Sequence, residues 1–189
     1  ANTFVNYGRL WRQFIKDGKQ LLWMSERDNW NHLYLYDVQK SKVIRQITTG
    51  DWFVRGIQRV DEEKGEIYFS ASGVNRNEDP YLIHYYKIGM DGRNMVALTP
   101  EEGNHSAQYT YDYHYLLDTY SKVDAAPVTV LRDAQTGKLV KTLETADITT
   151  LKKHGWVAPE VFVAKGRDGK TDMWGIIQRP TNFDPNKKY

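Results

Sequence analysis

Serine and histidine are the residue types in this sequence that could carry out acyl transfer, and neither occurs in a known catalytic pattern. A serine nucleophile is usually activated on a strained Gly-x-Ser-x-Gly turn, and none of the six serines lies in one: Ser25, Ser41, Ser70, Ser72, Ser106 and Ser121. The histidines form neither His-x-His nor His-Glu-x-x-His, and we interpret each as a strand or loop residue with a local hydrogen-bond partner: His32, His84, His105, His114 and His154. The sequence therefore predicts no catalytic residue and no metal site.

Three acidic clusters are the remaining candidates for chemistry: Asp61-Glu62-Glu63, Glu78-Asp79 and Glu101-Glu102. Paired carboxylates can serve as the acid and base of a glycosidase or can hold a substrate amine. Each cluster falls in a predicted turn, so we interpret them as solvated turn residues. Cysteine is absent, which excludes disulfides and thiolate chemistry, and no glycine-rich loop precedes a helix to hold a phosphate. We expect no cofactor.

Composition indicates the class of protein to which this chain belongs. The 189 residues carry 26 Lys and Arg against 24 Asp and Glu, a net charge of +2, which gives no electrostatic reason to expect a nucleic-acid partner. Apolar runs are only a few residues long, so we expect no membrane span in this chain. Aromatic residues make up 13% of the sequence, and no segment keeps a helical apolar period for three turns. The sequence predicts an all-β protein.

Short apolar or alternating runs recur between polar turns and predict ten strands. They cover residues 20–25, 32–37, 43–48, 52–57, 67–71, 82–88, 95–99, 115–118, 127–131 and 139–143. The residues that close successive groups, Ile47, Leu98 and Leu143, lie 51 and 45 residues apart. About four short strands in each such interval are typical of β-propeller blades, which must stack to bury their faces. We therefore predict a partial β-propeller of about three four-stranded blades, with a non-repeating β-sandwich as the alternative.

The repeat ends after residue 144. Residues 146–153 could form one or two helical turns with Asp147 as N-cap. Residues 159–165 and 173–177 then alternate around the turn Arg167-Asp168-Gly169-Lys170 and predict a β-hairpin. This gives three parts: blades over 1–146, a linker over 147–158, and a hairpin of different architecture within 159–189.

Four segments resemble the dipeptidyl peptidase IV branch of the prolyl oligopeptidase family of serine peptidases. They are residues 23–37 (WMSERDNWNHLYLYD), 46–52 (QITTGDW), 118–121 (DTYS) and 159–185 (PEVFVAKGRDGKTDMWGIIQRPTNFDP), in the order in which the family has them. The resemblance implies that residues 1–146 are the last blades of an eight-bladed propeller. It also implies that residues 159–189 are the first, truncated hairpin of an α/β-hydrolase domain.

The same resemblance implies a function for a larger parent protein. The parent would release N-terminal dipeptides with Pro or Ala at the second position from peptide substrates, as a serine-type homodimer in the periplasm or at the cell surface. The Ser-Asp-His triad would lie beyond Tyr189, and the glutamates that hold the substrate amine would precede Ala1, so this chain would be inactive. Only Tyr7, shortly before the Phe14–Gly18 stretch, stands where the family places an aromatic residue of the substrate pocket, and packing in the core is the alternative role for it.

Two other classes of function remain open. A non-enzymatic β-propeller that binds a protein partner would need the same blade features, and only the terminal hairpin favours the peptidase. A carbohydrate-binding β-domain would use exposed aromatic residues as stacking platforms, and the six Trp residues are enough for that.

Overall fold

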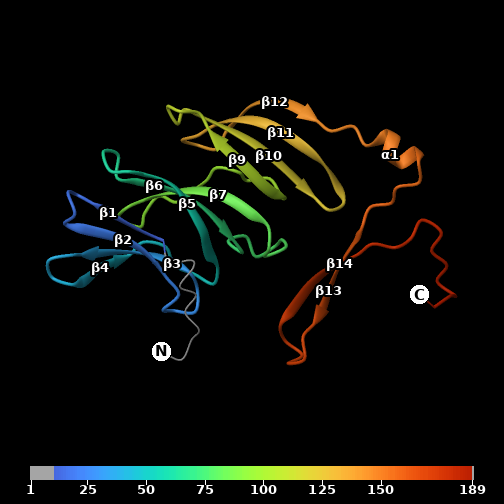
Figure 1. The fold of residues 1–189 in the computed structure, drawn as a ribbon, viewed down its shortest axis with the longest axis horizontal. Helices are drawn as coiled ribbons and strands as arrows, with labels where there is room; N and C mark the ends of the chain where they lie inside the picture. The colour runs from blue at the N-terminus through green and yellow to red at the C-terminus, as the bar shows by residue number, and fades with distance from the viewer. Residues whose placement is uncertain (1–10, 189) are drawn as a thin grey trace.

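The computed structural model describes residues 11–188 and shows, over this range, three four-stranded sheets, a hairpin and one short helix (Figure 1). Strands that follow one another in sequence are neighbours in each sheet and run antiparallel, as in a propeller blade. We call the sheets blades 1, 2 and 3. Blade 1 contains β1 (Arg12–Ile15), β2 (Gln20–Ser25), β3 (His32–Asp37) and β4 (Lys42–Gln46). Blade 2 contains β5 (Phe53–Asp61), β6 (Glu66–Ser72), β7 (Ile83–Gly89) and β8 (Val96–Ala97). Blade 3 contains β9 (Asn104–Tyr109), β10 (Tyr115–Lys122), β11 (Ala125–Asp133) and β12 (Leu139–Thr145).

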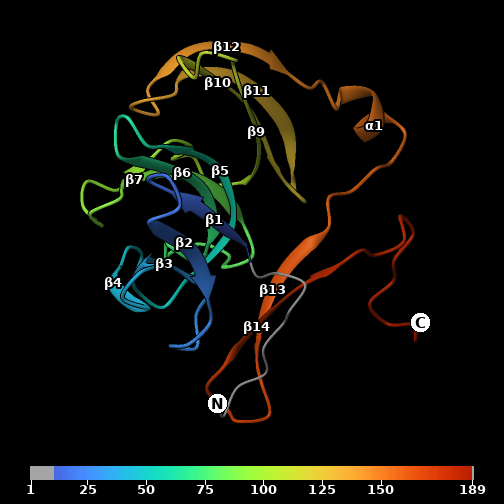
Figure 2. The same ribbon diagram turned by 60° about the vertical axis from the view of Figure 1, so that its left-hand side comes forward.

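The blades stack side by side, with blade 2 in the middle (Figure 2). The burial of single strands reflects this order. In β6 every residue from Ile67 to Ser72 is buried, because both faces of the strand are covered. In β10, a middle strand of blade 3, Leu116 and Asp118 are buried but Tyr115 and Leu117 are exposed, so one face of this blade is uncovered. The stack is therefore open at the side of blade 3, and it is not a closed ring.

The largest apolar cluster lies between blades 1 and 2. Phe69 of β6 is fully buried there, with its ring centroid 6.2 Å from that of Trp52 and 5.7 Å from that of Tyr86. The other buried members of the cluster are Ile15, Leu22, Met24, Leu33, Leu35, Ile47, Val54, Ile67, Ala71 and Ile88. Side chains from both blades fill this layer, which is how one sheet with two apolar faces becomes stable.

A smaller cluster joins blade 2 to blade 3, formed by Tyr68, Leu98, Leu116 and Ala134. The Tyr68 hydroxyl donates to Glu66 Oε2 at 3.1 Å and accepts from Gln135 Nε2 at 2.7 Å, so the contact between the blades is both polar and apolar. Burial raises the pKa of Tyr68 to about 12, and the hydroxyl therefore keeps the proton that it donates at neutral pH.

The turn between β11 and β12 fits closely against blade 2. The Asp133 carboxylate accepts hydrogen bonds from the backbone N–H groups of Gln135 and Thr136 at 2.9 and 2.8 Å, an arrangement typical of Asp-initiated turns. Gly137 follows with φ +72°, a left-handed conformation that glycine adopts without strain. A Cβ atom at this position would lie 2.5 Å from the carbonyl oxygen of Ala97 and 2.8 Å from Leu98 Cα.

We expect Gly137→Ala to destabilise the chain more than Gly65→Ala. Gly65 has a similar φ of +67° in the β5–β6 turn, but a Cβ there would meet nothing within 4 Å. Both changes introduce left-handed strain, and only Gly137→Ala adds a clash with backbone, which raises its loss by roughly 1–3 kcal/mol. Urea unfolding followed by tryptophan fluorescence measures the difference. Equal losses would contradict the close approach of this turn to blade 2.

The chain continues from blade 3 into α1 (Thr149–Lys153) and then into a separate two-stranded sheet of β13 (Glu160–Lys165) and β14 (Asp172–Ile177). Figure 2 shows this hairpin running away from the ends of the blades. The exposed Asp168 carboxylate organises its turn by accepting from the Thr171 hydroxyl and from the N–H groups of Lys170 and Thr171, which lowers the pKa of Asp168 to about 2. No helix within residues 11–188 is long and apolar enough to cross a membrane.

The predicted fold class is confirmed: the protein is all-β, with three four-stranded blades and a terminal hairpin, and the sandwich alternative is wrong. Two strands were not predicted: β1, which is only four residues long, and β9, which is mostly polar. The strand predicted over 95–99 is reduced to Val96–Ala97. Asp147 is not the N-cap of α1: Ile148 holds that position, and the Asp147 carboxylate instead accepts from the N–H of Thr149 at 2.8 Å.

Candidate functional site

The serine hydroxyls that have hydrogen-bond partners contact structural groups. Ser25 Oγ and Ser72 Oγ accept from the guanidinium groups of Arg27 and Arg55, each at 3.1 Å, and Ser70 Oγ donates to the carbonyl of Gly56. Within residues 11–188 no serine is hydrogen-bonded to a histidine ring, and no group of three His, Asp or Glu side chains is arranged to hold a metal ion. Clefts and buried polar groups without a hydrogen-bond partner are the other features of the described residues that could form a site.

The histidines make local contacts, as predicted. His32 contacts the Thr48 hydroxyl at 3.0 Å and the Gly50 carbonyl at 2.9 Å, and it closes the β3–β4 end of blade 1. His154 contacts the carbonyl of Thr150 in α1 at 2.8 Å. His84 donates from Nδ1 to the carbonyl of Thr99 at 2.8 Å, in an equivalent position of blade 2.

His105 belongs to a larger buried network in blade 3. Its Nε2 contacts the carbonyl oxygen of Glu101 and its Nδ1 contacts Asp118 Oδ1, both at 2.8 Å. The other oxygen of Asp118 accepts from Arg132 Nε at 2.9 Å, and Arg132 also pairs with the Glu101 carboxylate. Asp118 and Arg132 are 0% and 1% exposed, so these charges depend on one another for solvation.

The interpretation of the acidic clusters as solvated turn residues is wrong for Asp61 and Glu78, whereas the Glu101 side chain is 39% exposed. Asp61 is buried and pairs with Arg59 at 2.9 Å, and Glu101 pairs with the buried Arg132. The Glu78 side chain is only 7% exposed and faces His84, with Glu78 Oε1 3.3 Å from His84 Nε2. Arg59 lies on the same strand as Asp61, and His84 lies on β7 beside the loop that carries Glu78. Turn composition alone does not reveal such partners.

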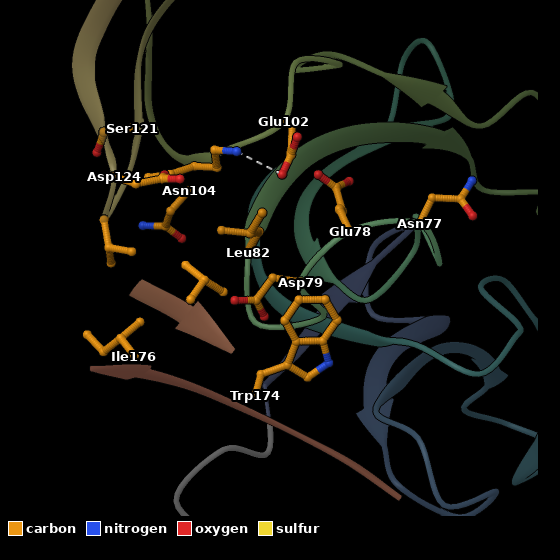
Figure 3. Close-up of a pocket in the computed structure, with 13 residues that line it drawn as sticks. Asn77, Glu78, Asp79, Leu82, Glu102, Asn104, Ser121, Asp124, Trp174 and Ile176 are labelled. Carbon is orange, nitrogen blue, oxygen red and sulfur yellow. Dashed lines mark hydrogen bonds and ion pairs between the residues drawn. The ribbon is translucent and has the colours of Figure 1, made fainter. Parts of the chain in front are cut away.

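A pocket of about 490 Å³ lies where the ends of blades 2 and 3 meet the terminal hairpin (Figure 3). Blade 2 contributes residues of its β6–β7 loop, blade 3 contributes the start of β9 and the β10–β11 turn, and the hairpin contributes side chains of β13 and β14. The lining residues are Asn77, Glu78, Asp79, Leu82, Glu102, Asn104, Ser121, Lys122, Val123, Asp124, Val161, Trp174 and Ile176. Its walls are therefore acidic on the blade side and apolar on the hairpin side.

Glu78 is a charged group of this pocket whose side chain is only 7% exposed. Its Oε2 atom is inaccessible to solvent and has no hydrogen-bond partner among the described residues. Its Oε1 lies near His84 Nε2, but that contact lacks hydrogen-bond geometry, and Nε2 is also without a hydrogen bond. Burial, and secondarily the charge of Glu78, raise the pKa of the neighbouring Tyr86 hydroxyl.

Lys122 is the only cationic side chain that lines the pocket in the described chain. Its ammonium group donates to Glu102 Oε1 at 3.0 Å, the contact that Figure 3 marks with a dashed line. This hydrogen bond, together with the charges of Glu102, Asp124 and Glu78, raises the pKa of Lys122 although partial burial lowers it. The pocket therefore already stabilises an ammonium group.

Sequence reasoning did not find this pocket. Tyr7, the predicted substrate contact, lies outside the described residues, and the Phe14–Gly18 stretch that follows it forms the end of β1 and the turn into β2. The one sequence signal near the pocket was the Glu78-Asp79 pair, which was interpreted as solvated. The hairpin side, with Trp174 and Ile176, is almost 100 residues away in sequence.

Comparison with protein families gives a match to the dipeptidyl peptidase IV (DPP IV) N-terminal region over residues 2–127. Among curated proteins, the chain is 29% identical over 171 residues to the probable dipeptidyl peptidase 4 of Arthroderma benhamiae, covering 88% of this chain and 21% of that protein. It is 26% identical over 168 residues to the probable dipeptidyl-aminopeptidase B of Neosartorya fischeri, covering 86% of this chain and 18% of that protein.

Two solved structures have the same fold over most of this chain. The dipeptidyl peptidase 4 of Porphyromonas gingivalis superposes with a TM-score of 0.71 at 27% identity, covering 94% of this chain and 24% of that structure. A putative dipeptidyl aminopeptidase IV from Bacteroides ovatus gives a TM-score of 0.75 at 26% identity, covering 94% and 27%. The chain thus spans about a quarter or less of the length of these relatives.

Proposed function

Because this chain belongs to the family of dipeptidyl peptidase IV N-terminal regions, we propose that it is the non-catalytic propeller portion of a serine-type dipeptidyl aminopeptidase. The observation that carries the proposal is the match to two peptidase structures over 94% of the chain, an extent greater than the three blades alone. A propeller that only binds a partner has no evident use for a further hairpin that is not part of any blade.

The proposal assigns a role to each part of the chain. Residues 1–146 are the last blades of the parent's propeller, residues 147–158 are a linker, and residues 159–189 open an α/β-hydrolase domain. The exposed apolar side chains of the hairpin support this division, since Phe162, Met173 and Ile177 are 40, 52 and 39% exposed and would be covered by such a domain. The parent would carry its Ser-Asp-His triad in that domain.

For the parent we propose release of N-terminal dipeptides with Pro or Ala at the second position from peptide substrates. The blades would restrict access to the triad, so that peptides enter and folded proteins do not. We further propose that the parent is a homodimer located in the periplasm or at the cell surface. Tyr7 is proposed as the one substrate contact supplied by this chain.

The purified 189-residue chain is expected to be inactive on Gly-Pro-p-nitroanilide, whereas the longer chain encoded at the same locus hydrolyses it. The difference should reach at least about 10⁶-fold, because no serine of residues 11–188 has an activating base. A fluorophosphonate probe, which labels activated serines, should label the longer chain and leave the 189-residue chain unlabelled.

Two results would contradict the proposal. Hydrolysis by the 189-residue chain itself would show that a nucleophile lies within it. Absence of both hydrolysis and labelling in the longer chain would favour the non-enzymatic binding module.

A further inference from the structure

The pocket between the blades and the hairpin carries an excess of negative charge. Four carboxylates line it (Glu78, Asp79, Glu102 and Asp124), and Lys122 is the single cation against them in the described chain. Lys122 is already bound to Glu102. In Figure 3 Glu78, Asp79 and Glu102 lie on the blade side, opposite the Trp174 and Ile176 side chains of the hairpin. An anion would be repelled from this pocket, and a cation attracted to it.

Glu78 supplies a second and independent observation. Its side chain is 7% exposed, and its Oε2 is a buried acceptor without a donor in the described residues. Buried carboxylate oxygens in folded proteins normally accept hydrogen bonds, because an unsatisfied charged acceptor loses its hydration without replacement. A hydrogen-bond donor supplied by a ligand would replace the hydration that Glu78 loses on burial.

The other half of the pocket is apolar. Leu82 and Val123 from the blades and Val161, Trp174 and Ile176 from the hairpin line it. An aromatic ring beside carboxylates suits an alkylated cation, because the ring face attracts the charge while aliphatic carbons contact the remaining wall. A fully hydrated inorganic cation would leave these side chains unused. The carboxylates also do not form a group that could hold a metal ion.

We propose that this pocket binds a primary alkylammonium group on an apolar stem, the chemistry of a lysine side chain. The ammonium group has three donors, and the four carboxylates that line the pocket offer the acceptors for them. The aliphatic stem lies against Trp174 and Ile176. The binding needs no catalytic centre, so it holds whether or not the parent is a peptidase.

Isothermal titration calorimetry of the 189-residue chain with Nα-acetyl-lysine N-methylamide tests the proposal. The neutral counterpart Nα-acetyl-norleucine N-methylamide has a similar stem and lacks the ammonium group. We expect the lysine probe to bind at least about tenfold more tightly, the ratio expected when a charge-assisted hydrogen bond to a buried carboxylate is gained. Equal affinity for the two probes would reduce the pocket to an apolar groove and overturn the proposal.

Substitutions that remove a negative or a positive charge from the pocket test whether the lysine probe binds there. Glu78→Gln keeps the shape of the side chain and removes its charge, and should weaken binding of the lysine probe about tenfold. Lys122→Gln removes the competing ammonium group and should strengthen binding severalfold. Glu63→Gln makes the same change as Glu78→Gln on an exposed turn residue of blade 2 and should leave affinity unchanged.

Asp79→Asn replaces Glu78→Gln as the decisive variant if the latter does not fold. The asparagine oxygen can still accept from the N–H of Tyr81, as Asp79 Oδ1 does at 2.8 Å, so the loop is retained while the charge is lost. Weaker binding in this variant supports the site. Two results would overturn the proposal. One is that each charge-removal variant that folds, Glu78→Gln or Asp79→Asn, binds the lysine probe as tightly as the unaltered chain does. The other is that Glu63→Gln loses as much affinity as those variants lose.

Discussion

Arg132→Met is expected to lower the free energy of unfolding of this chain by about 3–5 kcal/mol, the loss typical when one partner of a buried ion pair is removed. Arg132 is 1% exposed and donates to Asp118 Oδ2 at 2.9 Å and to the carbonyl of Gly137 at 3.3 Å. Methionine keeps most of the side-chain volume and removes every donor. The buried Asp118 carboxylate then keeps only its hydrogen bond from His105.

Urea unfolding followed by circular dichroism measures the loss, and Arg76→Met is its matched control. Arg76 also forms an Arg–Asp pair, with Asp51 at 2.6 Å, but the two side chains are 73 and 66% exposed. Solvent already screens such a pair, so little change is expected in the control. The double variant Asp118→Asn/Arg132→Met should lose less than the sum of its single changes, because the partners act as one unit. Losses equal to that of Arg76→Met would contradict a structural role for the network.

The same network supports the candidate site. Arg132 holds Glu101, and the next residue, Glu102, lines the pocket and binds Lys122. Without Arg132, the loop that carries Glu102 loses its anchor to β11. Binding of the lysine probe by a folded Arg132→Met variant should therefore weaken as well, although Arg132 does not line the pocket.

The parts of the fold that could be predicted from the sequence are those in which local composition and tertiary environment agree. The strand 32–37 was predicted with the bounds that β3 has, because apolar and aromatic residues fill it between two polar turns. In contrast, β9 reads Asn-His-Ser-Ala-Gln-Tyr and has no apolar alternation. It is a strand because it pairs with β10, from Leu116 with Tyr109 to Ser121 with Asn104, and because His105 is buried by the network. Both the pairing with β10 and the burial of His105 depend on tertiary structure, so the local sequence of β9 does not reveal them.

The candidate site could not be predicted for a related reason. Its acidic wall depends on the burial of Glu78 against His84, which follows from the return of the β6–β7 loop over β7. Its apolar wall comes from Trp174 and Ile176 of a hairpin that shares no repeat with the blades. From the sequence, Glu78 and Asp79 were interpreted as solvated turn residues, and only the stacking of blades 2 and 3 beside the hairpin brings them and Trp174 to one cavity.

Phe69→Ala is expected to lower the free energy of unfolding by about 3–5 kcal/mol through loss of burial and formation of a cavity. Phe69 is 0% exposed in β6 and lies between Trp52 and Tyr86 in the cluster that joins blades 1 and 2. Phe14→Ala is the matched control, because Phe14 is 59% exposed in β1 and should change stability little. Urea unfolding followed by tryptophan fluorescence reports the loss, since Trp52 lies beside the altered position.

Successive side chains of β6 face different blades, and this determines which strands should lose stability in Phe69→Ala. Phe69 points toward blade 1, whereas its neighbour Tyr68 points toward blade 3 and joins the second cluster. In a stack where each sheet contacts only its neighbours, Phe69→Ala should weaken hydrogen-exchange protection most in β2, β3 and β6 and least in β10 and β11. Uniform loss of protection across all three blades would contradict a nearest-neighbour stack. A loss of stability no larger than that of Phe14→Ala would show that the blades are held together by something other than this aromatic layer.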